Sequence, residues 1–173
     1  MSRNYWLTSD THFLHQNIIT YCKRPFYDVD NMTEELVERW NSVVKKGDYI
    51  YHLGDFFMGT PSNSREDAKR DWILSSLNGR ITLILGNHDD VAYLAGKKRF
   101  HEIVLWKPWN NKIGKQPMLF THVPVHQDSI MYGDLDSLNV HGHTHNWGSP
   151  KGPYRSVCVE LTNYTPVNLE EIS

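Results

Sequence analysis

The sequence predicts an α/β protein in which two packed sheets carry helices on the outside. In the first half of the chain, short apolar runs alternate with helical patterns, as in β-α-β units. After Phe100 the apolar periodicity shortens toward two, which is typical of strands. The chain has 173 residues, enough to bury a substantial core without disulfides, so we expect a single domain over residues 1–173.

Three helices are expected in the first half. The stretch from Asn31 to about Lys46 begins with acidic residues and stops at Gly47, which are start and stop signals of a helix. A second helix covers about Ser64 to Leu77, and a short third one covers Val91 to Ala95. The residues of the second helix that we expect to face inward, against a sheet, are Ala68, Trp72, Ile73 and Leu77.

Strands are expected in most of the remaining sequence. Apolar runs in the first half cover Tyr5–Ser9, Tyr49–Leu53 and Ile81–Leu85. In the second half, strands are expected over Ile103–Trp109, Lys112–Phe120, Tyr154–Leu161 and Val167–Leu169, with a turn at Asn110-Asn111. The alternation there indicates mostly antiparallel pairing.

Composition excludes several classes of function. The net charge is −2, so the chain has no overall positive field that would hold nucleic acid or an anionic membrane. No apolar run approaches the ~18 residues of a membrane span. The two cysteines, Cys22 and Cys158, are expected to be buried thiols and not a disulfide, which fits a cytoplasmic protein.

Five apolar runs end at residues that bind metal ions. Those ends are Asp10-Thr11-His12, Gly54-Asp55, Gly86-Asn87-His88-Asp89, His122 and Gly142-His143-Thr144-His145. The carboxyl ends of neighbouring strands lie side by side in α/β proteins, so these side chains can meet although they are far apart in sequence. Oxygen and imidazole ligands without cysteine suit Mn, Fe, Zn, Co or Ni. A central carboxylate such as Asp55 can bridge two cations.

This series resembles the five motifs of the calcineurin-like metallophosphoesterases, in order and over residues 10–145. The resemblance implies a four-layer α/β/β/α sandwich of two mixed sheets and two divalent transition metal ions, with Mn as first choice and Fe, Zn, Ni or Co as alternatives. One metal would be held by Asp10, His12, Asp55 and His145, and the other by Asp55, Asn87, His122 and His143. His88 would be the catalytic imidazole. The opening Ser9–Phe13, with His15, Asn17 and Ile18, resembles a short subgroup of bacterial and phage genomes.

The sequence departs from the family pattern at Met58. Many members carry an aspartate three places after the bridging one, where it orients the catalytic imidazole. We therefore expect Asp89 or a backbone carbonyl to hold the second nitrogen of His88. Alternatively, the run Phe56-Phe57-Met58 lines an apolar wall of the site.

Other residues have competing interpretations. His15 and Arg24 follow the first ligand pair closely and are our candidates for phosphate contacts, although Arg24 could equally be a surface residue. Of the further candidates, His52 is expected to be a core or surface histidine, and His141 to be packed or to support a ligand. Trp106 and Trp109 are expected to pack between layers. His126 is expected at the rim of the site or in a plain loop, and Trp147 near the site.

The function that we expect is metal-dependent hydrolysis of a small phosphodiester or nucleotide-like phosphate ester. The near-neutral charge and the lack of a basic track favour a small substrate over nucleic acid. A DNA or RNA nuclease is the first alternative. A protein phosphatase is a further one, and a non-catalytic interaction module is disfavoured because every motif position is filled. No membrane partner is expected, and the sequence sets no oligomeric state.

Overall fold

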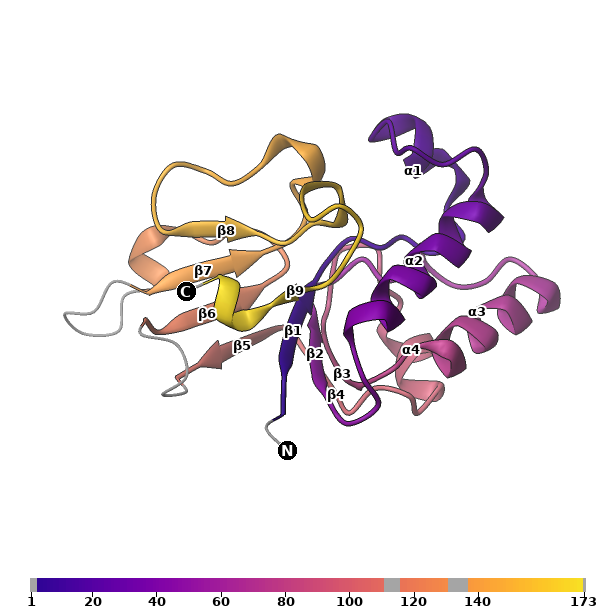
Figure 1. Ribbon diagram of the computed structural model, residues 1–173, viewed down its shortest axis with the longest axis horizontal. Helices are drawn as coiled ribbons and strands as arrows, with labels where there is room; N and C mark the ends of the chain where they lie inside the picture. Colours follow the sequence, from indigo (N-terminus) through magenta and orange to yellow (C-terminus); the bar gives the residue numbers. More distant parts are fainter. Residues whose placement is uncertain (1–2, 111–115, 131–136, 173) are drawn as a thin grey trace.

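The protein folds as two facing sheets with helices on one side (Figure 1). The computed structural model describes residues 3–110, 116–130 and 137–172. One sheet has the strand order β4-β3-β2-β1-β9, and the other has the order β5-β6-β7-β8. Within the described residues no helix is long and apolar enough to cross a lipid bilayer.

The first sheet is built from the β-α-β units that the sequence predicts. Its parallel strands are β1 (Tyr5–Thr8), β2 (Tyr49–His52), β3 (Arg80–Ile84) and β4 (Glu102–Val104). The short edge strand β9 (Val167–Asn168) pairs antiparallel with β1. The connecting helices are α1 (Gln16–Tyr21), α2 (Val29–Val43), α3 (Ser64–Ser76) and α4 (Val91–Gly96).

The second sheet is mixed, and the prediction of mostly antiparallel pairing in the second half was wrong. Strand β5 (Trp106–Trp109) pairs antiparallel with β6 (Met118–Thr121), as expected. However, β6 pairs parallel with β7 (Leu138–His141), and β7 pairs parallel with β8 (Tyr154–Ser156). Alternation of apolar residues reveals a strand but not its direction, and the intervening segments are long enough to cross over between parallel strands.

The α/β fold with two mixed sheets is confirmed, and the two outer faces are covered differently. Helices α1 to α4 all lie on the side of the first sheet (Figure 1). After β4, the helical segments in the described part of the chain are single 3₁₀ turns. These are η1 (Gln127–Ser129), η2 (His145–Trp147), η3 (Val159–Leu161) and η4 (Leu169–Glu171). No α-helix of the described residues therefore forms the expected fourth layer.

Two apolar clusters hold the layers together. One lies between the helices and the first sheet and includes Trp40 of α2 and Ile50 of β2, both almost fully buried. The other lies between the sheets and includes Leu7, Phe120 and Val140, which have no exposed surface. Because both faces of the first sheet are covered, its strands are apolar on both faces.

Helix boundaries follow capping residues. The side chains of Asp28, Asn63 and Asp90 accept hydrogen bonds from backbone N–H groups in the first turns of α2, α3 and α4. The predicted inward positions of Ala68 and Trp72 were wrong, because Ala68 is exposed and Trp72 is 49 % exposed. Arg70 is buried in α3 instead, where its guanidinium bonds the carbonyls of Met58 and Gly59 and the carboxylate of Glu66.

Other local predictions had mixed outcomes. Trp109 packs between the sheets as expected, but Trp106 is 59 % exposed, because it lies on the opposite face of β5. The expected strand from Tyr154 to Leu161 stops at Ser156 and continues into η3. The predicted turn at Asn110-Asn111 and the start of the Lys112–Phe120 strand fall partly on residues 111–115, outside the described residues. Cys22 and Cys158 are free thiols, as predicted, but only Cys158 is buried, whereas Cys22 is partly exposed.

Candidate metal centre

The carboxyl ends of strands from both sheets meet at one edge of the molecule. Asp10, Asp55 and Asn87 follow β1, β2 and β3 of the first sheet, whereas His122 and His143 follow β6 and β7 of the second. Backbone hydrogen bonds fasten these loops to one another, since Asp10 N donates to Gly54 O and His12 N donates to Asp55 O, both at 3.0 Å. All seven predicted metal ligands are brought to this edge.

The backbone is left-handed at five of the seven predicted ligands. Their φ angles are 58° at Asp10, 47° at His12, 55° at Asp55, 68° at His143 and 47° at His145. A left-handed conformation is uncommon for residues other than glycine, although Asp and His adopt it more readily than most. Such residues gather at functional sites, where the surrounding structure holds them in place.

The motif glycines make room for the ligands. A Cβ atom on Gly54 would overlap His122 Nδ1, and one on Gly142 would overlap a carboxylate oxygen of Asp10. A Cβ atom on Gly86 would overlap Asp55 Oδ1. Glycine is therefore needed at these positions because the backbone of one loop passes close to the ligand of another.

The ligand atoms of Asp10, His12 and His145 form a first group, in which they lie within 4.8 Å of one another. Asp10 Oδ2 is fixed by the backbone N–H of His143 at 2.9 Å and by the Cys158 thiol at 3.3 Å. Asp10 Oδ1 is buried 3.7 Å from His145 Nε2. Neither that oxygen nor the two ring nitrogens of His12 has a hydrogen-bond partner among the described residues.

The ligand atoms of Asp55, His122 and His143 form a second group of the same size. Asn87 Oδ1 lies 2.9 Å from His122 Nε2, and His143 Nδ1 lies 3.2 Å from the same nitrogen. The other ring nitrogen of His122 donates to the carbonyl of Leu53 at 2.8 Å. This bond selects the tautomer whose Nε2 lone pair points into the group, as in known metal sites.

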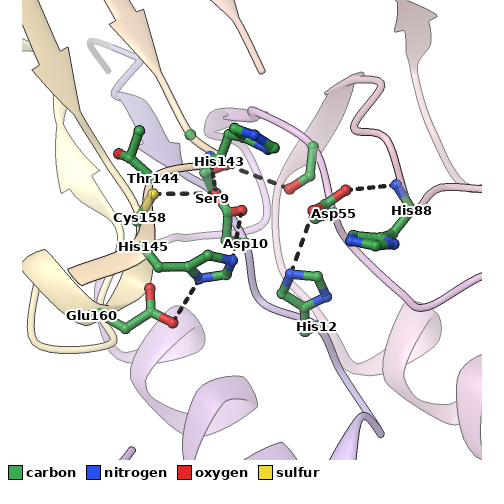
Figure 2. A network of polar contacts seen from close by, with 12 residues as sticks. Ser9, Asp10, His12, Asp55, His88, His143, Thr144, His145, Cys158 and Glu160 are labelled. Carbon is green, nitrogen blue, oxygen red and sulfur yellow. Dashed lines mark hydrogen bonds and ion pairs between the residues drawn. The ribbon is translucent and has the colours of Figure 1, made fainter. Parts of the chain in front are cut away.

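Asp55 lies between the two groups. Its Oδ1 accepts a hydrogen bond of 2.9 Å from the backbone N–H of His88. Its Oδ2 lies 3.4 Å from His12 Nε2 of the first group and 3.5 Å from His122 Nε2 of the second. Figure 2 shows this carboxylate between His12 and the loop of His88. One oxygen of Asp55 is thus shared by both groups.

The electrostatics of the centre fit a bound cation. Burial raises the pKa of Asp10. Burial also lowers the pKa of His12 to about 3, so its ring is neutral at physiological pH, the form that binds metals. Asp10 Oδ1 and both ring nitrogens of His12 are buried without a hydrogen-bond partner among the described residues, which costs free energy. A divalent cation would satisfy these atoms, and the nitrogen and oxygen ligands suit a transition metal.

Comparisons with known proteins agree with this centre. A sequence model described as "Calcineurin-like phosphoesterase" matches residues 4–163. The chain belongs to this family. It is therefore a metal-dependent phosphoesterase, as its motifs predicted.

Relatives of this phosphoesterase occur in archaea, bacteria and phages. It is 35 % identical to "Uncharacterized protein MJ1445" of Methanocaldococcus jannaschii over 98 % of this chain and 89 % of the relative. It is similar to the crystal structure of AQ665 from Aquifex aeolicus, a protein of unknown function, with a TM-score of 0.77, 25 % identity and coverage of 99 % and 98 % of the two chains. The "Gene 66 protein" of Mycobacterium phage L5 is 38 % identical over 50 % of this chain and 40 % of its own length.

Arg24 has a different role from the predicted phosphate contact. The side chain is buried, and all of its N–H groups face the protein. They contact the carbonyls of Asp10 and Thr11, the sulfur of Met32 and the carboxylate of Glu160. The guanidinium therefore supports the loop that carries the first ligands, and it has no donor left for a substrate.

Glu160 is a functional residue that the sequence analysis missed. Its Oε1 accepts a hydrogen bond from His145 Nδ1 at 3.0 Å (Figure 2). The same oxygen accepts a hydrogen bond from Arg24 Nη2 at 2.6 Å. The carboxylate thus orients His145 so that Nε2 faces Asp10. Burial would raise the pKa of Glu160, but the bond from His145 and the charge of Arg24 lower it to about 2. No local pattern marks Glu160, since its partners are 15 and 136 residues away.

Within the described residues, neither Asp89 nor a backbone carbonyl orients the ring of His88, contrary to both expectations. Its carboxylate accepts three backbone hydrogen bonds of 2.9 Å, from Asp55, Phe56 and Gly86. Asp89 therefore connects the loop after β2 to the loop after β3. The carbonyl of His88 accepts from Gly59, and its ring lies 5.6 Å from that of His12. Within the described residues, the ring of His88 has no hydrogen-bond partner.

The other candidates lie around this centre. His15 is half-buried, with its ring 5.7 Å from that of His12, and its buried Nδ1 has no hydrogen-bond partner in the described part of the chain. His52 and His141 are fully buried and bond Thr11 and Ser149, which confirms packed roles for both. The remaining predicted positions are exposed, namely Met58, His126 and Trp147.

Proposed function

We propose that this phosphoesterase hydrolyses small phosphodiesters or nucleotide-like phosphate esters with two divalent metal ions, Mn first and Fe, Zn, Ni or Co as alternatives. The observation that carries the proposal is the position of Asp55 Oδ2, 3.4 Å from His12 Nε2 and 3.5 Å from His122 Nε2. A carboxylate oxygen shared by two ligand groups is the arrangement that a two-metal site needs.

Each ligand group would hold one of the two proposed metal ions. The first metal would be held by Asp10, His12, Asp55 and His145, and the second by Asp55, Asn87, His122 and His143. Bound cations would neutralise the phosphate oxygens and lower the pKa of a coordinated water, which makes that water a nucleophile at neutral pH. The protein's own contribution is to fix the ligand atoms before any cation binds, through the bonds to Glu160 and Leu53.

His88 is the proposed proton donor. Its backbone N–H is anchored on Asp55, and its ring is near His12 with both nitrogens available to a substrate. In this position the imidazole would donate a hydrogen bond to a phosphoryl oxygen or a proton to the departing alcohol oxygen. His15 would contribute a further phosphate contact, because its ring lies next to that of His12 on the same side of the centre.

A small substrate fits the charge distribution. The net charge of the chain is −2. Arg24, the arginine that the sequence analysis placed near the phosphate, instead donates its hydrogen bonds to Glu160 and to backbone carbonyls. A long polyanionic strand gains most of its affinity from lysine and arginine contacts to phosphates. We also propose a cytoplasmic location, in keeping with two free thiols.

The test is turnover by metal-loaded protein on a panel of phosphomonoesters, phosphodiesters, cyclic nucleotides, single-stranded DNA and phosphopeptides. Asp55→Asn is the control, and we expect it to lose turnover and bound metal together. Equal activity in that variant would show that another site, or a contaminant, does the chemistry. If the protein prefers single-stranded DNA and its rate falls steeply at higher salt, it is a nuclease and this proposal is wrong.

A further inference from the structure

A large apolar groove opens directly beside the second ligand group. Its volume is about 720 Å³, and the predicted metal ligands Asn87 and His122 form part of its wall. The rest of the wall is mainly apolar and includes Leu105, Trp106, Leu119, Val123, Val125 and Ile130. Clefts of about 300–1,000 Å³ with apolar walls and few polar groups are typical of small-molecule sites. This groove is much larger than a phosphate group needs.

Strand register brings Trp106 to the metal end of the groove. In the antiparallel pair of β5 and β6, Trp106 lies directly opposite Thr121, which immediately precedes His122. Side chains of directly opposed residues lie on the same face of a sheet, about 5 Å apart at Cβ. The neighbours of Thr121 in β6 alternate, so Phe120 packs between the sheets and Thr121 faces the groove. The indole is thus close to the second ligand group.

The apolar groups of the groove are unusually exposed. Trp106 is 59 % exposed and Leu105 is 71 % exposed, and both line the same cavity as Val91 and Val123. Single exposed apolar residues are common on soluble proteins, but several that surround one cavity mark a binding surface. Exposed tryptophan is well suited to stack against a planar group.

The described residues of the groove offer no charge to a second phosphate. Among the described residues that line it, none is lysine or arginine, and the one acidic side chain, Asp89, is occupied by three backbone N–H groups. The polar edges are instead uncharged, and they include Asn110, Ser129 and Ser137. Such a lining accepts an uncharged group that is planar and partly polar, whereas it disfavours a continuing phosphate chain.

We propose that this groove binds a nucleobase or a similar uncharged aromatic group that is joined to the phosphate held at the ligand groups. The inference rests on the proposed function and adds the substrate class. The phosphate would lie at Asn87 and His122, and the aromatic group would stack on Trp106. Selectivity would then come from the second sheet, which contributes most of the apolar wall.

The test uses two substrates that share a p-nitrophenolate leaving group and differ in the other arm. One is the p-nitrophenyl ester of thymidine 5′-monophosphate, and the other is methyl p-nitrophenyl phosphate. Stacking of one base is worth a factor of roughly 10 or more, so we expect the nucleoside ester to have the higher kcat/KM by at least that factor. In Trp106→Ala the ratio of the two kcat/KM values should fall about tenfold. Trp72→Ala, which removes a 49 % exposed tryptophan from α3, should leave the ratio unchanged.

A binding measurement separates failure of the groove from failure of the proposed function. Uncharged thymidine is titrated into the wild-type protein, and the indole N–H signals are followed by NMR, with Trp106→Ala identifying the Trp106 signal. We expect that signal to shift even if no ester is hydrolysed. An unmoved Trp106 signal at millimolar thymidine, or equal loss of both substrates in Trp106→Ala, would overturn the groove proposal. Absence of turnover on every ester, with the signal shift present, would overturn the hydrolase proposal alone.

Discussion

The substitution Glu160→Gln isolates the charge that supports the first ligand group. Glutamine keeps the shape of the side chain and one acceptor oxygen but removes the negative charge. In the wild-type protein the Glu160 side chain is 3 % exposed, and the Arg24 side chain that it pairs with is 0 % exposed. Solvent therefore does not screen this pair, and the substitution leaves the guanidinium without its counter-ion.

Two estimates agree on how much Glu160→Gln lowers the free energy of unfolding. Glu160 Oε1 accepts three hydrogen bonds, from Arg24 Nε, Arg24 Nη2 and His145 Nδ1. Loss of the charge weakens each by about 1 kcal/mol, or about 3 kcal/mol in total. Removing one partner of a buried ion pair costs about 3–5 kcal/mol by direct measurement in other proteins. For a chain of this length, about 3 kcal/mol lowers Tm by roughly 6–12 °C.

The destabilisation caused by Glu160→Gln should decrease as the pH falls. In the metal-free protein, the pKa of Glu160 is lowered from 4.5 to about 2, since the bond from His145 and the charge of Arg24 outweigh the effect of burial. A lowered pKa stabilises the folded state above the ordinary pKa, and the stabilisation is lost as pH falls from 4.5 to about 2. The difference in unfolding free energy between the wild type and Glu160→Gln should therefore be full at pH 7 and shrink over that range.

The assay measures thermal unfolding in chelator and metal binding by titration calorimetry. Loss of a residue that orients a metal-binding histidine typically costs 10- to 100-fold in metal affinity, and we expect this loss at a temperature where Glu160→Gln is fully folded. Glu35→Gln is the matched control, because the pair Glu35–Arg39 is 38 % and 33 % exposed and contributes about 0.5 kcal/mol or less. If Glu160→Gln matched Glu35→Gln in both Tm and metal affinity, the role assigned to Glu160 would be refuted.

Two further predictions concern the loop after β3. His88→Ala should retain its metal but lose roughly 100-fold or more in turnover, since it removes the proposed proton donor and no metal ligand; unchanged kcat in the metal-loaded variant would exclude His88 from the mechanism. Asp89→Ala should lower the unfolding free energy by at least about 3 kcal/mol, because three backbone N–H groups lose their acceptor. Asp90→Ala, which removes a helix cap, should cost only about 1 kcal/mol in the same denaturant titration. Similar losses in these two variants would contradict the structural role of Asp89.

Much of the centre could be predicted because its ligands follow strands that are visible in the sequence. Apolar runs located β1, β2 and β3 to within one or two residues, and the parallel arrangement of that sheet brings their ends together. Asp10, Asp55 and Asn87 then had to share an edge. The glycines beside the ligands gave a second local signal, since each lies where another loop passes closely.

The contacts that support the ligands could not be predicted in the same way. Arg24 and Glu160 are 136 residues apart, and neither lies in a motif that requires the other. The carboxylate of Asp89 bonds backbone N–H groups, which every residue has, so no partner residue type reveals that role. Trp106 was placed inside because its strand alternates, but alternation does not say which of the two faces is covered.

The left-handed backbone at five predicted ligands shows that the whole fold, and not the local sequence, shapes the centre. Each such residue costs about 1–2 kcal/mol in backbone energy, and neither hydrophobic pattern nor helix propensity encodes the conformation. It persists because neighbouring loops hold it, as when Asp10 N bonds Gly54 O and His12 N bonds Asp55 O. Asp55 Oδ1 and Asp10 Oδ2 are fixed in turn by the N–H groups of His88 and His143, which leaves the other oxygen of each carboxylate facing the ligand groups. The fold thus orients the ligands through bonds that require no metal, and a bound cation would satisfy the ligand atoms that those bonds leave without a partner.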